Sequence, residues 1–319
     1  MFQLFSQTSY KFMAVRRYAY AVSAFLLLAG AAGWVVNGGF ALGIDFTGGL
    51  LIEYEFNQPV PIDKARDVVA RLGYAGAEIQ DIANDPRELM IRVPEEGGRA
   101  ADEASPSAKI LESLQAEIPG LTGDLRLEES VGPKIGQELR GKATWAVLIS
   151  LIGILLYITI RFEWKFAVAA VVALFHDVAV VLGVFAILER EITLPLIAAL
   201  LTIGGYSVND TIVIFDRVRE QLKVRRKESF LEVIDISVNQ TLSRTIITAS
   251  TTLFAVLALL LLGGHVIHDF ALAMFLGIIV GTYSSIFVAS AMALEIDQIV
   301  TRPRHKAPGR ASRATATGS

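Results

Sequence analysis

The sequence predicts a helical membrane protein with six transmembrane helices and one small α+β domain inserted after the first helix. Three observations predict this fold class. Hydrophobic residues make up 53% of the 319 residues and charged residues only 19%, whereas a soluble domain carries about 25% charged residues. Apolar runs of about 18 residues or more recur, each long enough to cross about 30 Å of hydrocarbon as a helix. One long polar stretch, residues 40–140, separates the first run from the others.

Composition and motifs exclude several functional classes. A net charge of −3 is too small to indicate a nucleic-acid partner. The absence of cysteine excludes disulfides and thiolate metal sites. The chain contains no Walker A sequence, no His-Glu-x-x-His and no Gly-x-Ser-x-Gly. We therefore expect neither an enzyme nor a bound cofactor or metal, and any work would draw on an ion gradient.

The apolar runs define the spans. A cytoplasmic N-terminus (1–17) precedes the first span at 18–36, which is too long for a signal-peptide core and is read as a membrane anchor. The other five spans lie within 142–293, at 142–160, 166–188, 192–215, 245–262 and 268–293.

Basic residues predict the orientation of the spans. Lys and Arg gather before span one, between spans two and three, between four and five, and after six. A six-span chain places all of these segments on one side, and basic residues favour the cytoplasm. Both termini are therefore predicted to be cytoplasmic, and residues 40–140 to lie outside.

Residues 40–140 are predicted to form one compact folded domain. Residues 50–56 alternate apolar and polar side chains, which is typical of a half-buried strand. Helical spacing follows at 61–72, strands at 78–82 and 88–93 around a turn at 84–86, a helix at 108–118 after a polar loop at 97–106, and a strand at 124–129. The order β-α-β-β-α-β predicts a ferredoxin-like domain.

Two further segments are cytoplasmic in this scheme. Residues 217–239 combine charges with spaced apolar residues and predict an amphipathic helix along the membrane surface, although a plain connector stays open. Residues 303–319 have no apolar face and are predicted to be disordered.

Ionisable side chains inside the spans are the main indication of function. A charge at a helix centre costs about 2.5–3.5 kcal/mol on insertion scales, so such residues usually face a bundle interior or a water path. Span three contains His176 and Asp177, span four contains Asn209 and Asp210, and Arg244 begins span five. Asp210 lies roughly 8 Å of helix rise inside its span and is the strongest candidate.

Helical spacing predicts two polar stripes. One contains Thr202, Tyr206, Asn209 and Asp210, and the other contains Arg244, Thr248, Thr251 and Thr252. If the stripes face each other, Arg244 would hold Asp210 ionised, and separating the two would let the carboxylate bind a proton.

Each candidate also has a structural interpretation. Ser and Thr in membrane helices usually bond their own backbone, so no hydroxyl is assigned a role. Arg244 lies close enough to the cytoplasmic end to reach the interface. His176 could be an interior histidine with satisfied hydrogen bonds. Asp216 and Arg217 lie at the membrane boundary, where a solvated ion pair is expected.

Several motifs carry a resemblance to a known family. Gly43–Gly49 (GIDFTGG) follows span one, Val131–Gly136 (VGPKIG) precedes span two, His176-Asp177 lies in span three, residues 205–220 (GYSVNDTIVIFDRVRE) form span four, and Ser243-Arg244-Thr245 opens span five. Together they resemble the SecD and SecF family of protein-export membrane proteins over roughly residues 10–300. The signature residues are Gly43, Asp45, Phe46, Thr47, Gly48, Gly49, Asp216 and Arg217. The single small outer domain favours the SecF branch.

The resemblance implies partners and a mechanism. The family works in the bacterial inner membrane, where SecF and SecD form a twelve-span assembly related to the RND transporters. This assembly helps the SecYEG channel move unfolded polypeptide, and YajC is a further candidate partner. The proton motive force drives movements of the outer domains, and Asp210 and Arg244 match the family's proton-passage residues. Asp177, His176 and Asn209 are assigned to the same pathway by position.

Two other classes remain open. Half of an RND-type proton-driven exporter of lipids or small molecules would have a similar membrane part, although such exporters usually carry larger outer domains. A passive assembly subunit is the third class, and the buried charge of Asp210 argues against it. The choice between H⁺ and Na⁺ as coupling ion stays open.

Overall fold

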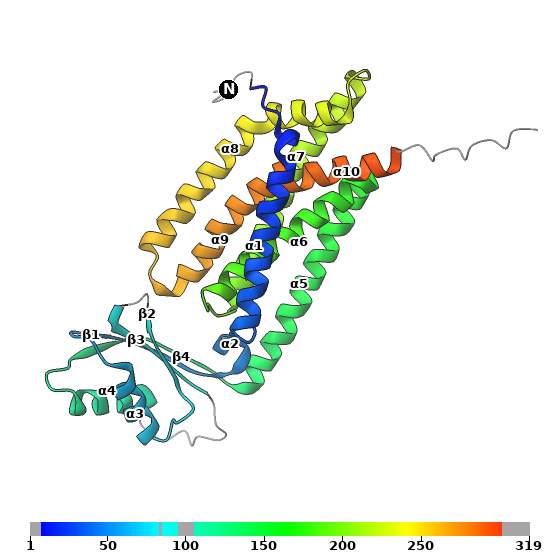
Figure 1. Cartoon of the computed structure of the whole chain (residues 1–319). Helices are drawn as coiled ribbons and strands as arrows, with labels where there is room; N and C mark the ends of the chain where they lie inside the picture. The colour runs from blue at the N-terminus through cyan, green and yellow to red at the C-terminus, as the bar shows by residue number, and fades with distance from the viewer. Residues whose placement is uncertain (1–7, 83–84, 95–104, 302–319) are drawn as a thin grey trace, which may run out of the picture.

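The protein is described by a computed structural model that covers residues 8–82, 85–94 and 105–301 (Figure 1). Within these ranges six helices are long and apolar enough to cross a membrane, which confirms the predicted fold class. The membrane part consists of η1 (Phe12–Val15), α1 (Arg16–Val36), α5 (Pro133–Arg161), α6 (Trp164–Ile187), α7 (Leu194–Val224), α8 (Phe230–Leu262), α9 (His265–Ser284), η2 (Ser285–Ala289) and α10 (Ser290–Thr301). The described ends of the chain lie at one end of the bundle, opposite the α+β domain (Figure 1).

Several helices extend past the predicted spans because hydropathy marks only the part that matches hydrocarbon. α5 begins with Pro133, a residue suited to a first helical turn, rather than at residue 142. α8 begins after Ser229 because a capping box forms there. The Ser229 hydroxyl accepts from the Glu232 amide at 3.3 Å, and the Glu232 carboxylate accepts from the Ser229 amide at 2.8 Å.

Residues 217–239 do not form the separate surface helix that their pattern predicts. They are divided between the end of α7 and the start of α8, which a turn at 225–229 joins. Their apolar residues Val218, Val233 and Ile234 are buried in the core of the bundle. The amphipathic pattern therefore reflects packing of two long helices rather than contact with the membrane surface.

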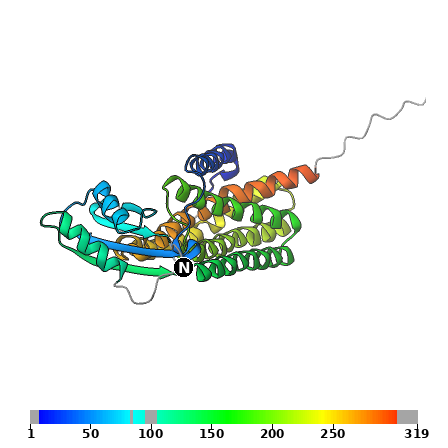
Figure 2. The ribbon, with the colours of Figure 1, turned by 90° about the horizontal axis from the view of Figure 1, so that it is seen from below.

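α6, α7 and α9 form the centre of the bundle, and α5 lies at its edge (Figure 2). The most apolar window of α6 is 56% buried within the chain, whereas that of α5 is 6% buried. α1 crosses α6 where Gly30 meets Gly183, and a Cβ atom on Gly183 would lie 2.8 Å from the Gly30 Cα. Only glycine at both positions lets the two backbones touch.

The last span contains an irregular segment. Between α9 and α10, residues Ser285–Ala289 are π-helical. The Ser290 hydroxyl donates to the Ser285 carbonyl at 2.9 Å across this segment. Such π-bulges often occur near functional sites, and this one places Ser284 and Ser285 inside the bundle, where both are fully buried.

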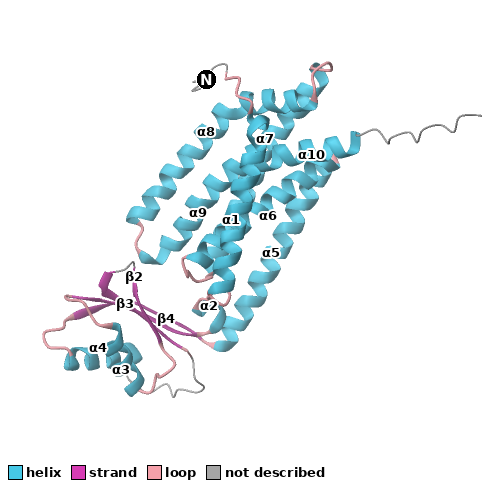
Figure 3. Cartoon of the chain, in the orientation of Figure 1, coloured by secondary structure: helices cyan, strands magenta, loops and turns pink. Residues whose placement is uncertain are grey.

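The outer domain has the predicted ferredoxin-like order. After the short helix α2 (Ile44–Thr47), its elements are β1 (Gly49–Phe56), α3 (Ile62–Arg71), β2 (Glu78–Ile82), β3 (Asp85–Val93), α4 (Pro106–Glu117) and β4 (Gly123–Val131). The sheet has the order β2-β3-β1-β4 with antiparallel neighbours (Figure 3). Ile52 pairs with Ile91 and packs with Val68, Ile110 and Leu114 in a core of its own.

Some predictions fall partly or wholly outside the described residues. These are the disordered tail at 303–319 and most of the polar loop at 97–106. Of the predicted turn at 84–86, Asp85 and Pro86 already belong to β3.

Candidate functional site

Asp210 lies near the middle of α7. The helix begins at the N-cap Thr193, whose hydroxyl accepts from the Leu196 amide at 3.4 Å, and Pro195 lies in the first turn. At 1.5 Å per residue, Asp210 lies roughly 24 Å along the axis from Leu194. The helix thus carries this carboxylate deep into the bundle, far from both ends.

The Asp210 carboxylate is buried and incompletely hydrogen-bonded. The residue is 3% exposed, and its Oδ2 atom has no hydrogen-bond partner among the described residues. A buried carboxylate oxygen without a partner is unfavourable unless the group binds a proton or gains a cation or donor. The carboxylate is therefore less completely hydrogen-bonded than a buried charged group normally is.

Arg244 lies on the neighbouring helix α8, as the sequence predicts. It is the basic side chain that interacts electrostatically with Asp210, yet no ion pair within 4.0 Å joins them. Arg244 is exposed on the surface of this chain. The structure therefore shows the predicted pair as neighbours that are not in contact.

The threonine hydroxyls on α8 bond the backbone of their own helix, which favours a structural role over proton transfer. Thr248 donates to the Arg244 carbonyl at 2.9 Å, Thr251 to the Ile247 carbonyl at 3.0 Å, and Thr252 to the Thr248 carbonyl at 3.0 Å. Each hydroxyl proton is thus engaged by its own helix. The Tyr206 hydroxyl differs, because it is buried on the Asp210 stripe and has no hydrogen-bond partner among the described residues.

Asp177 forms the centre of a second buried polar cluster. It is fully buried on α6, and three side chains bond its two oxygens. His176 Nδ1 lies 2.9 Å from Oδ1, while Ser284 donates to Oδ2 at 2.8 Å and Ser207 donates to the same oxygen. This cluster joins α6, α7 and α9, and Ser207 lies one helical turn before Asp210.

The cluster continues to α1 through His176. Its Nε2 atom lies 3.0 Å from Ser23 Oγ, which lies 3.1 Å from the Tyr283 hydroxyl. Tyr283 donates to the Ala19 carbonyl at 2.7 Å, so it accepts from Ser23, and Ser23 in turn accepts from His176. His176 Nε2 therefore carries a proton. In a neutral His176 the Nδ1 atom would then have no proton, and it could not bond an ionised Asp177. One further proton is therefore needed, on His176 Nδ1 or on Asp177. The donor count therefore assigns this buried pair one shared proton.

The other predicted residues lie apart from these clusters. Asn209 is exposed on the outer surface of α7, although it adjoins Asp210 in sequence. At the helix end Asp216 pairs with Arg161 at 3.0 Å, and Arg217 bonds Gln240 and Glu220, each at 2.6 Å. These boundary residues form the solvated contacts expected of them. Among the described residues, no three His, Asp or Glu side chains form a metal-binding group.

The signature segment after α1 lies against the bundle. Phe46 is buried among residues of α6 and α7, and Arg140 of α5 donates to its carbonyl at 2.6 Å. Gly48 has φ +75° and its Cβ position faces the Pro133 backbone at 3.1 Å. Glycine is therefore required at this turn between α2 and β1. Asp45 accepts from the Leu194 amide at 2.8 Å, at the start of α7.

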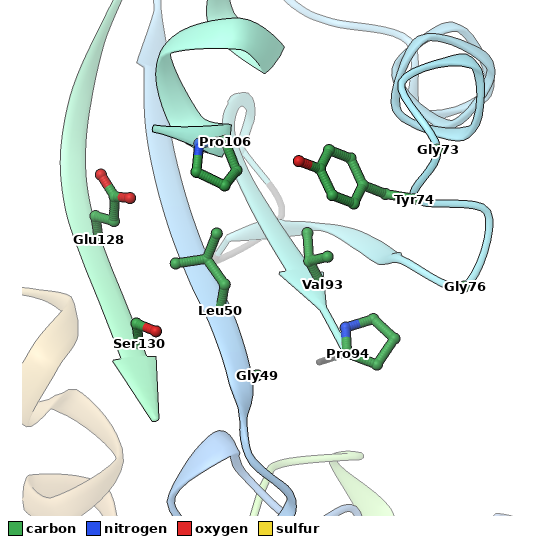
Figure 4. A pocket seen from close by; sticks show the side chains of 10 residues that line it. All are labelled: Gly49, Leu50, Gly73, Tyr74, Gly76, Val93, Pro94, Pro106, Glu128 and Ser130. Carbon is green, nitrogen blue, oxygen red and sulfur yellow. The ribbon is translucent and has the colours of Figure 1, made fainter. Parts of the chain in front are cut away.

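The outer domain contains one further concave site (Figure 4). A cavity of about 410 Å³ lies beside the start of β1 and the ends of β3 and β4. Leu50, Val93 and Pro106 line it, and the Tyr74 ring points into it from the α3–β2 loop (Figure 4). Glu128 lies at its edge, where Ser105 and Ser107 donate to its carboxylate at 2.7 and 2.6 Å.

The fold and the buried clusters define a multi-pass helical membrane protein with ionisable groups buried inside its helical bundle and one small α+β domain at one end of it. Residues 118–298 match the family model described as "Protein export membrane protein SecD/SecF, C-terminal", and residues 33–60 match "SecD/SecF GG Motif". The chain is 44% identical over 300 residues to the protein translocase subunit SecF of Desulfurispirillum indicum, covering 93% of each chain. It is 47% identical to that of Vibrio alginolyticus over 261 residues, 80% of this chain and 79% of the relative. The chain therefore belongs to the SecF family of protein translocase subunits.

Solved structures agree with this assignment. The crystal structure of SecDF from Thermus thermophilus, named a translocon-associated membrane protein, superposes with a TM-score of 0.80 and 41% identity. The match covers 92% of this chain and 39% of that one. A second structure, of SecDF in a super-membrane-facing form, gives a TM-score of 0.67 at 41% identity. The family resemblance drawn from the motifs is thus confirmed.

Proposed function

We propose that this chain, together with SecD, uses the proton motive force to promote polypeptide translocation through SecYEG in the bacterial inner membrane. Asp210 is the group that binds and releases the transported proton, and Arg244 modulates its charge. The His176–Asp177 pair belongs to the same pathway on the inner side of α7, and Asn209 on its exposed side. YajC is included as a further partner.

The observation that carries this proposal is the incomplete hydrogen bonding of Asp210. A buried carboxylate normally has hydrogen-bond partners for both of its oxygens, as Asp177 has. Asp210 has one buried oxygen that finds no hydrogen-bond partner in the described part of the chain, and Arg244 interacts with it from a distance. One charge crossing 100 mV yields about 2.3 kcal/mol, enough to shift a balance between two conformations.

A polar surface on the membrane part supports SecD as the partner. Thr202, Gly205 and Asn209 of α7 and Arg244 and Thr251 of α8 are all exposed in this chain. Polar side chains in a span usually face protein or a water-filled path rather than lipid. The Thermus thermophilus relative is named SecDF and aligns with this chain over 38% of its length. We infer that SecD helices cover the exposed faces of α7 and α8.

The orientation is proposed from the basic residues. The described ends of the chain lie at one end of the bundle and the α+β domain at the other. Arg16, Arg161, Lys165 and Arg219 all lie on the side of the chain ends. Positive charges stay in the cytoplasm, so the α+β domain is periplasmic, where it can contact emerging polypeptide.

The alternative, half of an RND-type exporter of lipids or small molecules, is less well supported. The matched relatives are named protein translocase subunits, which is a transport function rather than catalysis. The folded sheet domain spans only Gly49–Val131.

The test is Asp210→Asn, which keeps the shape of the side chain and removes the titrating proton. Export of a secreted reporter is measured in cells, and proton entry is measured in vesicles that contain the SecD complex. Asp216→Asn is the matched control, since Asp216 is a partly exposed carboxylate on the same helix. We expect Asp210→Asn to lose most of both activities while association with SecD is retained, and Asp216→Asn to keep them. Normal export by an assembled Asp210→Asn complex would contradict the proposal.

A further inference from the structure

The outer domain contacts the membrane bundle at the turn that precedes α7. We call residues 188–193 the α6–α7 corner. The segment after α1 pairs with it through its backbone: the Gly43 amide donates to the Ile192 carbonyl at 2.9 Å, and the Ile192 amide donates to the Ala41 carbonyl at 2.7 Å. Leu42 and Ile192 form a parallel bridge. The chain that enters the outer domain is therefore bonded to the start of α7.

Asp45 strengthens this link with a charge. Its Oδ2 atom accepts from the amide of Leu194, the first residue of α7. The first amides of a helix have no partner within it, and the positive end of the helix dipole favours a carboxylate there. A shift of α7 along its axis must therefore move Asp45 or break this contact.

A second contact reaches the corner from the sheet itself. Arg92 of β3 pairs with Glu191, and it also lies 3.2 Å from Glu78 of β2. The side chains of Arg92 and Glu191 are only 12% and 18% exposed, so water and salt screen the pair weakly. Burial lowers the pKa of the Arg92 guanidinium from its ordinary value, whereas Glu78 raises it. The pair thus joins a strand in the middle of the sheet order to the same corner that Asp45 holds.

The surroundings make this connection stiff. Phe46 is buried against Phe185 and Leu196, on either side of the corner. Glu189 takes the left-handed conformation with φ +53°, which closes the turn tightly. Movements at this point are therefore shared by α7 and the outer domain rather than absorbed by a loose linker.

We propose that the α6–α7 corner, held by Asp45 and Glu191, is the joint that transmits displacement of α7 to the outer domain. α7 also carries Asp210, so one rigid helix connects the buried carboxylate to this joint. Asp45, Arg92 and Glu191 are positioning residues in this role and do not handle the ion. The inference rests on the proposed function, since it assigns the mechanical output of the same helix.

The test is the double variant Asp45→Ala/Glu191→Ala in the full complex with SecD. Both side-chain contacts of the joint are lost, while its backbone pairing and the surroundings of Asp210 are unchanged. We expect proton entry into vesicles to match the unaltered complex and reporter export to fall to the level of Asp210→Asn. Asp63→Ala is the control, because Asp63 is an exposed acidic residue of the same domain. Export equal to that of the unaltered complex would overturn the inference.

Conservative replacement separates this role from a general loss of stability. In Asp45→Asn the amide oxygen still accepts from the Leu194 amide, so export should stay close to normal, whereas Asp45→Ala should lose it. Equal export by these two variants would overturn the role of Asp45. Failure of the proposed function is recognised separately, because the unaltered complex would then admit no protons.

A cross-link tests whether the joint acts as a rigid unit. The chain has no cysteine, and a Cβ atom on Gly43 would lie 2.9 Å from Thr193 Cγ2. The two positions adjoin each other, so the pair Gly43→Cys/Thr193→Cys can be oxidised to cross-link the segment after α1 to the corner. We expect the oxidised and reduced forms of this variant to export equally. A reversible loss of export on oxidation would show that the corner has to open, and would overturn the inference.

Discussion

The two buried aspartates differ in how completely their oxygens are hydrogen-bonded. Asp177 accepts from two serines and bonds His176, whereas one oxygen of Asp210 has no hydrogen-bond partner within the described ranges. A saturated carboxylate resists change, and an unsaturated one responds to a proton or a cation. The shared proton of the His176–Asp177 pair adds a constraint that a substitution can test.

We predict that Asp177→Asn is stable and Asp177→Ala is not. The Asn oxygen accepts from Ser207 and Ser284, and its amide donates to a neutral His176, so every partner stays satisfied. Alanine leaves these groups unpaired, at about 1–3 kcal/mol for each buried group. Thermal unfolding of the purified complex in detergent is the measurement. Equal melting temperatures of the two variants would contradict the assignment of one shared proton to the His176–Asp177 pair. Proton-driven export should fall in both variants, because neither keeps the carboxylate.

Sequence reasoning could find the buried charges but not their partners. Asp210 and Asp177 stand out because a charge inside an apolar run requires an explanation. Ser23, Ser207 and Ser284 look like ordinary small residues of membrane helices, and only the packing of α1, α7 and α9 around α6 brings them to Asp177 and His176. Helical spacing places Asn209 and Asp210 on one stripe, yet in the structure Asn209 is exposed and Asp210 is buried.

At the scale of elements, the closest helix contact is the crossing of α1 and α6. The backbones of Gly30 and Gly183 leave no room for a side chain. We predict that Gly183→Val pushes α1 away from α6 and disturbs the neighbouring Ser23–His176 contact. Overpacking of this kind costs about 1–3 kcal/mol. Gly153→Val on α5 is the control, since no atom lies within 4 Å of its Cβ position. The measurement is the melting temperature of each variant. Equal destabilisation by Gly183→Val and Gly153→Val would show that the α1–α6 crossing is no more sensitive to an added side chain than the surface of α5.

Helix existence was predictable and helix length was not. Hydropathy located all six spans, because the cost of polar groups in lipid is large. Hydropathy could not show that α7 continues to Val224 or that α8 starts at Phe230. The first turns of α8 are stabilised instead by the Ser229–Glu232 capping box and by burial of Val233 and Ile234. The ferredoxin-like order was predictable because each strand alternates or is bounded by turns. The π-helical segment at Ser285–Ala289 has no sequence signal of its own.

At the scale of the whole molecule, the chain leaves polar side chains of its membrane part uncovered. Its central helices α6 and α9 are well covered, yet α7 and α8 expose polar residues in the part that crosses the membrane. The GG segment and the Arg92–Glu191 pair fix the outer domain to α7. The exposed polar face therefore lies beside Asp210, on the far side of α7 from the Asp177 cluster.

Gly205 marks the place where a partner helix would approach most closely. It is exposed on α7, and no other described element lies within 4 Å of its Cβ position, whereas a Cβ on the adjacent Gly204 would meet Leu174 of α6 at 3.2 Å. Small residues at membrane interfaces let helices pack closely without a hydrophobic driving force. If SecD covers this face, Gly205→Leu should leave the fold of this chain intact and strongly reduce co-purification with SecD. Gly153→Leu, an equally open glycine on α5, should purify with SecD as the unaltered chain does. Undiminished co-purification of Gly205→Leu would mean that SecD binds elsewhere, and the exposed polar surface of α7 and α8 would then need a different partner.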